Sequence, residues 1–219
     1  EIKMVGEWIT AVFGGNEKAG GASWSSENTP EKKPARPIYG LIGQTMVATP
    51  SDWRPVSTLR PGDRVMTFDN GFQRIESVGV TELCADDEDC PYAQWPLEVP
   101  AGYIGNRDRM CLMPQQNVII ETDLAEAQFG DPFAMVPACE LDGVCGVHRI
   151  RPTEPQKVYS LSFARDEVVF VNGSALVHCP NGALEGENLM VTPKASAYTP
   201  LPRDIARAVC RELAAVTGC

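Results

Sequence analysis

Positive charge is scarce in this sequence, because only 19 lysines and arginines stand against 29 aspartates and glutamates. The resulting formal net charge of -10 repels a phosphate backbone, so we expect neither nucleic acid nor an anionic membrane surface as a partner. Long apolar runs are missing as well, since Lys3, Glu7 and Thr10 interrupt the first apolar segment. None approaches the roughly 20 residues that span a bilayer, and we expect no membrane span.

Signatures of catalysis and of cofactor binding are also missing. The chain has only two histidines, His148 and His178, and no Ser/His/Asp spacing. The glycine-rich stretch GGNEKAGG, residues 14–21, has no strand before it and no Lys-Ser/Thr ending, so it does not match a phosphate-binding loop. We therefore expect no cofactor and no metal, and we expect His148 to be a half-exposed strand residue rather than a base.

Cysteine, by contrast, is abundant at eight residues, an even number that favours an oxidising compartment. Three short spacings suggest small disulfide-closed loops, although buried free thiols remain an alternative. The candidate pairs are Cys84 with Cys90, Cys139 with Cys145, and Cys210 with Cys219. Zinc is disfavoured because the first two spacers have five residues. The acidic stretch at 85–90 is expected to be a solvated turn, with calcium binding as the alternative.

The N-terminal residues 1–13 have the spacing of a short amphipathic helix that Gly14 and Gly15 end. Its apolar positions are Ile2, Val5, Trp8, Ile9, Val12 and Phe13. Residues 14–37 are rich in Gly, Ser, Asn, Glu, Lys and Pro, a composition typical of a flexible linker. A helix this short needs its apolar face covered, either by a partner or subunit or by its own domain. The chain begins at Glu1 rather than Met, which suggests a processed product or a fragment.

Residues 38–201 contain short β-branched runs separated by turn signals, which predicts an all-β domain. The clearest strand candidates are TMVAT, DRVMTF, FQRIESVGV, QNVIIET, KVYSLSF, EVVFVNG and SALVH. Pro61-Gly62-Asp63 predicts a turn before one strand, and Asp69-Asn70-Gly71 predicts a tight hairpin because Asn-Gly accepts positive φ. Residues 202–219 predict a terminal helix that starts at Pro202, with Asp204 as its cap and Gly218 as its stop.

Three blocks of the β region resemble the Hint domain, the self-processing fold shared by inteins and Hedgehog C-terminal domains. Residues 40–75 (GLIGQTMVATPSDWRPVSTLRPGDRVMTFDNGFQRI) resemble the opening of bacterial Hint domains. Residues 107–120 (RDRMCLMPQQNVII) and 158–180 (VYSLSFARDEVVFVNGSALVHCP) resemble the second and the late block, in the same order. The resemblance implies a Hint-type horseshoe of short antiparallel strands, with short helices at both ends.

The same resemblance implies that the self-processing residues are missing. The nucleophile of the family is a Cys thiol at the head of the domain, and in this sequence Gly40 stands in that position. The His that assists the reaction in the family corresponds to Gln116, whose amide cannot transfer a proton at neutral pH. Met113 stands where the family has a Ser or Thr. The His of the late block corresponds to Asp166. Val177-His178-Cys179 lacks the Asn that an intein exit requires.

These observations predict a non-enzymatic structural or interaction module built on an inactive Hint fold. Its expected partner is a protein or a larger assembly, bound through the N-terminal helix, and an extracellular, surface or virion-like location is favoured over the cytoplasm. The oligomeric state stays open. Residual self-cleavage near Gly40 is the enzymatic alternative, and an acidic metal-binding module is a third.

Overall fold

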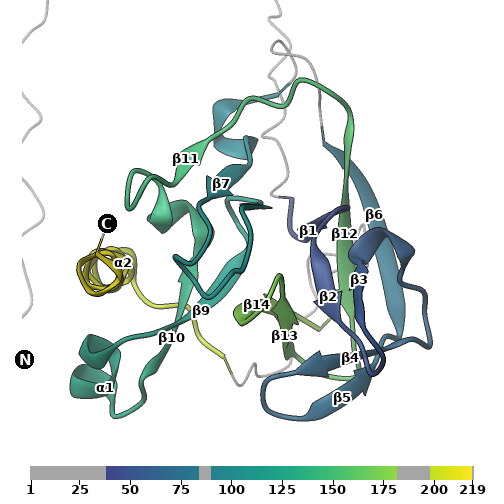
Figure 1. Ribbon diagram of the computed structural model, residues 1–219, viewed down its shortest axis with the longest axis horizontal. Coiled ribbons are helices and arrows are strands. Elements are labelled where there is room, and N and C mark those ends of the chain that lie inside the picture. The colour runs from purple at the N-terminus through teal and green to yellow at the C-terminus, as the bar shows by residue number, and fades with distance from the viewer. Residues whose placement is uncertain (1–37, 84–89, 182–197, 219) are drawn as a thin grey trace, which may run out of the picture. The chain divides into compact units, whose positions relative to one another are not determined.

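A computed structural model of the protein describes residues 38–83, 90–181 and 198–218, which belong to one compact unit of the chain. The predicted helix at residues 1–13 and the linker at 14–37 lie outside the described residues, so both stay predictions. The strands form two β-sheets, and helices α1 (Asp123–Phe129) and α2 (Arg203–Thr217) lie to one side of them (Figure 1). All strand pairs of the two sheets are antiparallel.

The first sheet has six strands, and its outer edge is the seven-residue strand β6 (Figure 1). In spatial order it consists of β11 (His148–Arg149), β7 (Leu97–Val99), β8 (Met110–Leu112), β1 (Leu41–Ile42), β12 (Gln156–Ser162) and β6 (Ser77–Leu83). Strand β1 is only two residues long, yet it joins β8 to β12 through Leu41, which pairs with Leu112 and Tyr159. The residue before it, Gly40, therefore lies in the middle of this sheet.

The second sheet has eight strands and holds the most deeply buried ones. Its main path is β10 (Phe133–Pro137), β9 (Asn117–Glu121), β14 (Ala175–Cys179), β13 (Glu167–Val171), β2 (Met46–Ala48) and β3 (Trp53–Pro55), while β4 (Arg64–Thr67) pairs with β13 and with β5 (Gly71–Arg74). Strand β14 lies between β9 and β13, and its side chains are buried along its whole length on both faces of the sheet. This explains its continuous apolar sequence, ALV.

The tight hairpin predicted at Asp69-Asn70-Gly71 is confirmed between β4 and β5, where Gly71 has a φ of 64°. The expected strand FQRIESVGV, however, is two strands in different sheets. Strand β5 ends at Arg74, and the chain then crosses at Ile75, which is 1% exposed, into β6. Burial of Ile75 at the crossing fixes where the chain leaves one sheet for the other.

The predicted C-terminal helix is confirmed as α2 (Arg203–Thr217), with Gly218 as a left-handed C-cap. Asp204 is not its cap, because it lies in the first turn and the N-cap is Pro202, which forms no side-chain cap bond. The helix packs on β10 and on the short helix η3 (Ala138–Leu141) with Val209 and Cys210 fully buried (Figure 1). A second helix, α1 (Asp123–Phe129), was not predicted.

The buried carboxylate of Glu140 fixes α2 to this core. Its Oε1 lies 2.9 Å from Arg203 Nε and its Oε2 lies 3.8 Å from Arg207 Nη1, and both arginines belong to α2. The Tyr103 hydroxyl also donates to the Cys210 carbonyl at 2.8 Å. The helix is thus part of the same core as the strands.

Candidate functional site

Gly40 and Gln116, where the resemblance places the self-processing Cys and its assisting His, are in direct contact. Gly40 N–H donates to Gln116 Oε1 at 3.1 Å. Gln116 Nε2 in turn donates to the His178 carbonyl at 2.7 Å, and His178 Nε2 lies 3.5 Å from Asp166 Oδ2. Asp166, where the resemblance places the His of the late block, is therefore linked to Gln116 through His178. The site joins the start of β1, the turn before β9, the turn before β13 and the end of β14.

Gly40 occupies a backbone position that leaves no room for a side chain. Its φ is 132°, a conformation that L-residues rarely adopt. A Cβ atom built on Gly40 would lie 2.6 Å from the Tyr159 carbonyl oxygen and 2.9 Å from Val158 Cγ1. Because the nearest atom belongs to the backbone, no rotamer change can relieve this contact. A side chain at this position would therefore require the backbone of β1 or β12 to shift.

Gln116 connects the strands of the site through hydrogen bonds of its neutral side-chain amide. The residue is 3% exposed, and its Oε1 accepts from Gly40 N–H while its Nε2 donates to the carbonyls of His178 and Asn117. An amide has the one acceptor and two donors that these contacts use. The side chain thus holds β1, β9 and β14 together without a group that titrates.

His178 belongs to this site, which the sequence analysis did not predict. It is 5% exposed, and neither ring nitrogen has a hydrogen-bond partner among the described residues. Its ring packs against Tyr198 with centroids 5.4 Å apart, and the Tyr198 hydroxyl bonds Asp69. Burial lowers the pKa of His178 below 6.5, although Asp166 opposes the shift. The His178 imidazole is therefore buried and uncharged at neutral pH.

Asp166 also accepts a hydrogen bond from the backbone that follows β14. Its Oδ1 accepts from Asn181 N–H at 2.6 Å, while Asn181 Nδ2 donates to the Ala164 carbonyl at 3.1 Å. These bonds fix the Asn181 side chain in a turn. The nearest thiol, Cys179, lines the same small cavity, but burial raises its pKa to about 12, so it is protonated at neutral pH.

We expect the stability of the protein to fall on mild acidification, because of His178. A histidine with a lowered folded pKa binds its proton more weakly in the native state, so its stabilising contribution is present above about 6.5 and is lost as the pH falls below it. Thermal melts at pH 7.5, 6.5, 5.5 and 4.5 measure this loss. His178→Gln should flatten the curve, whereas His148→Gln, at an exposed position, should leave it unchanged. Equal curves for the wild type and His178→Gln would refute this role.

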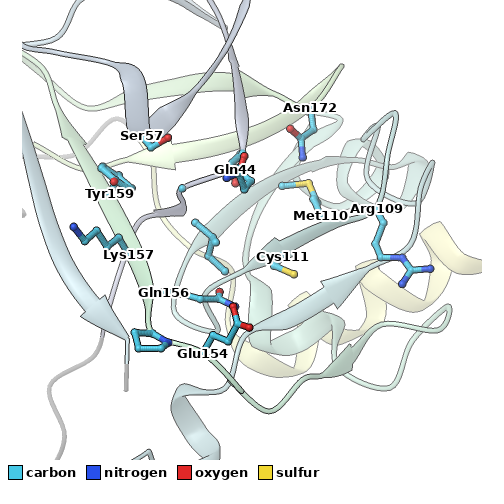
Figure 2. Close-up of a pocket in the computed structure, with 14 residues that line it drawn as sticks. Gln44, Ser57, Arg109, Met110, Cys111, Glu154, Gln156, Lys157, Tyr159 and Asn172 are labelled. Atoms are coloured by element: carbon cyan, nitrogen blue, oxygen red, sulfur yellow. The ribbon is translucent and has the colours of Figure 1, made fainter. Parts of the chain in front are cut away.

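Room for a ligand at the Gly40 site is minimal. The cavity lined by Gly40, Gln116 and His178 measures about 10 Å³, which is room for about one water molecule. A larger hollow of about 560 Å³ opens on the other side of β1, between β8 and β12 (Figure 2). Its lining includes Gln44, Ser57, Cys111 and Gln156. The sequence analysis identified none of these lining residues.

The cysteine predictions are partly wrong. Cys139 and Cys210 are free thiols, so the expected Cys139–Cys145 and Cys210–Cys219 pairs are not formed. Cys90 and Cys145 each take part in a disulfide. Cys139 instead packs beside the buried Glu140, its Sγ 3.8 Å from Oε1, and Cys210 lies in the interface of α2 with the core. Burial raises the pKa of both thiols, which keeps them protonated.

Several predicted residues lie outside the described ranges. They are Ile2, Val5, Trp8, Ile9, Val12, Phe13, Cys84 and Cys219, together with acidic residues 85–89. Within the described ranges, no group of three or more His, Cys, Asp or Glu residues is arranged to hold a metal ion. No helix in those ranges combines the length and the apolar character that crossing a membrane requires. His148 lies exposed in β11, as an ordinary strand residue.

Comparison with known proteins assigns the family. Residues 40–177 match the Hint domain family, which is more than half of the chain, and the protein belongs to that family. No curated protein sequence matches it.

Among solved structures, the chain is similar to a bacterial intein-like domain from Clostridium thermocellum, with 14% identity, 64% of this chain and 99% of that chain covered, and a TM-score of 0.47. It is also similar to the gp41-1 intein, with 11% identity, 66% and 100% covered, and a TM-score of 0.39. The MchDnaB-1 intein shows 13% identity, 63% and 98% covered, and a TM-score of 0.40. The family assignment rests on the match over residues 40–177.

Proposed function

We propose that this Hint domain is a non-enzymatic structural or interaction module that has lost self-processing. The observation that carries the proposal is the closed backbone environment of Gly40, where a Cβ would lie 2.6 Å from the Tyr159 carbonyl oxygen. Covalent catalysis needs a thiol or hydroxyl that can reach the scissile carbonyl, and no such group fits at this position. The neutral Gln116 and the protonated Cys179 supply neither an acid nor a nucleophile.

The partner in this proposal is a protein that binds the apolar residues of segment 1–13. The support is the helical spacing of six apolar residues on a segment followed by a polar linker, a pattern that suits helix-in-groove recognition. The double variant Trp8→Asp, Phe13→Asp tests it in the full chain. Proteins that the wild type retains from an extract of its source should be lost, whereas Thr10→Asp, outside the apolar set, should keep them. Retention of the same proteins by all three chains would refute the docking role.

The loss of self-processing is tested by restoring the missing groups. We expect Gly40→Cys combined with Gln116→His to remain uncleaved, because the contact with Tyr159 keeps the new thiol out of line with the preceding carbonyl. Intact mass spectrometry after incubation with and without dithiothreitol, a thiol that releases thioesters, measures this result. Gly62→Cys, which has open space around it, serves as the matched control. A fragment starting near residue 40 in the wild type would instead establish residual self-cleavage.

A further inference from the structure

Most sheet edges among the described residues carry features that block pairing with another strand. Strand β11 has two residues, His148 and Arg149, and β3 contains Arg54 and Pro55. Strand β5 ends at Arg74, and β10 ends at Pro137 and packs against α2. Short length, basic side chains, proline and a covering helix are the usual protections of an edge.

Strand β6 has none of these protections. It is seven residues long (SVGVTEL), contains no proline or lysine, and pairs within the described ranges only with β12. Val80, at its middle, is 53% exposed. A long, regular and partly apolar edge is a template for another strand.

The backbone groups that β6 directs outward follow from the pairing of β12. Gly43 N–H donates to the Lys157 carbonyl, so Lys157 and Tyr159 direct their backbone groups toward β1. The alternate residues of β12 therefore face β6 and bond the residues opposite them. The β6 residues opposite Lys157, Tyr159 and Leu161 consequently direct their N–H and C=O groups away from the sheet. They are Glu82, Val80 and Val78.

We propose that β6 pairs antiparallel with β6 of a second copy of this chain, about a two-fold axis at Val80. Only the register centred on Val80 overlaps all seven residues. In this register Val80 exchanges both backbone bonds with its own mate, and Val78 pairs with Glu82 of the other copy. The outward groups of one edge therefore meet the outward groups of the other, as a two-fold interface requires.

Side chains favour the same register. Val80 lies opposite Tyr159 of β12, so the dimer would create a continuous row of Tyr159, Val80 and the same two residues of the second copy. Cross-strand pairs of aromatic and β-branched residues stabilise a sheet. Glu82 faces Val78 here, whereas a register centred on Glu82 would oppose two carboxylates, and one centred on Gly79 would set Glu82 against Glu76. Charge thus selects against the neighbouring registers.

The association is expected to be weak and to depend on salt. A single pair of edge strands buries less than the roughly 1,200 Å² of a stable interface. The net charge of -10 on each copy also opposes association, and salt screens that repulsion. Dimerisation should therefore strengthen between 0.05 and 0.5 M salt. This inference depends on β6 and not on segment 1–13, so it and the proposed function can fail independently.

The experiment is sedimentation velocity on the full chain over a concentration series, with non-reducing intact mass to detect covalent dimers. Val80→Lys and Val80→Glu each place like charges directly opposite, and each should weaken the dimer by about tenfold or more. An equimolar mixture of the two should recover it, because Lys and Glu then face each other. Val216→Lys, at a 77% exposed position of α2, is the matched control and should associate as the wild type does.

Each outcome decides the inference. Reversible dimers of the wild type and of Val216→Lys, loss of dimer in both Val80 variants and its recovery in the mixture support it. A wild type that stays monomeric at the highest concentration overturns it. So does undiminished association of either Val80 variant, or failure of the mixture to recover the dimer. Circular dichroism of each variant confirms folding, which substitution at a half-exposed strand position should leave intact.

Discussion

Gly40→Ala should lower the free energy of unfolding by about 3 kcal/mol, which corresponds to a melting temperature lower by about 10 °C for a domain of this size. Two costs add up. The backbone would be held at a φ of 132°, which an L-residue adopts only with strain. The new methyl would also lie 2.6 Å from the Tyr159 carbonyl oxygen, so β1 and β12 must separate. Urea titration followed by tryptophan fluorescence measures the change.

Gly62→Ala separates these two costs. Gly62 also has a positive φ, 97°, but a Cβ built there meets nothing within 4 Å. It should therefore lose only the backbone contribution, about 1 kcal/mol. If Gly40→Ala costs no more than Gly62→Ala, the space around Gly40 can hold a side chain after all. The central support for lost self-processing would then disappear.

Composition and local pattern predicted the β domain well because its strands have strong local signals. EVVFVNG and SALVH became β13 and β14, whose β-branched residues are buried on both faces. Turn chemistry was equally local, since Asn70-Gly71 forms the hairpin that its sequence predicts. The terminal helix followed from apolar residues four apart, and Val209 is fully buried as expected. Signals that act within a few residues are readable from the chain alone.

Features that depend on distant contacts were not predicted. Residues 72–80 have the pattern of one strand in the sequence, but the chain divides into β5 and β6 at Ile75, which is buried. The cysteine spacings suggested local disulfide loops, but Cys139 and Cys210 are free thiols. Helix α1 did carry local signals that were overlooked: Thr122 caps it by accepting from Ala125 N–H, and Gly130 ends it.

The candidate site also combines features that the sequence predicted with features that depend on distant contacts. The resemblance aligned Gly40 and Gln116 with the Cys and the His that act together in the family, and the two residues are hydrogen-bonded here. The same resemblance likened Val177-His178-Cys179 to an intein exit, but the missing Asn led us to set that match aside. His178 reaches the site because β14 pairs with β9 beside Gln116. The sequence did not indicate the positive φ of Gly40, which follows from its close approach to β12. The glycine at position 40 is visible in the sequence, but the lack of space around it is visible only in three dimensions.

Gln116→Leu should have the second largest effect, a loss of about 3 kcal/mol in the free energy of unfolding. Leucine fills a similar volume, but it leaves Gly40 N–H and the His178 carbonyl buried without partners, and each such group costs about 1–3 kcal/mol. The matched control is Gln44→Leu, an exposed glutamine without a side-chain partner among the described residues, which should change stability by less than about 0.5 kcal/mol. Equal losses in the two variants would refute a structural role of the Gln116 amide.

Gln116→Glu distinguishes the amide bonds from simple packing. The carboxylate can still accept from Gly40 N–H, but it cannot donate to the His178 carbonyl, and it adds a buried charge. Burial raises the pKa of such a carboxyl in the folded state, so acidification should restore stability to this variant relative to the wild type. Gln116→Leu has no proton to gain and should show no such recovery. Melting temperatures of the three chains between pH 7.5 and 4.5 measure the difference, and parallel curves would mean that the amide contributes only its volume.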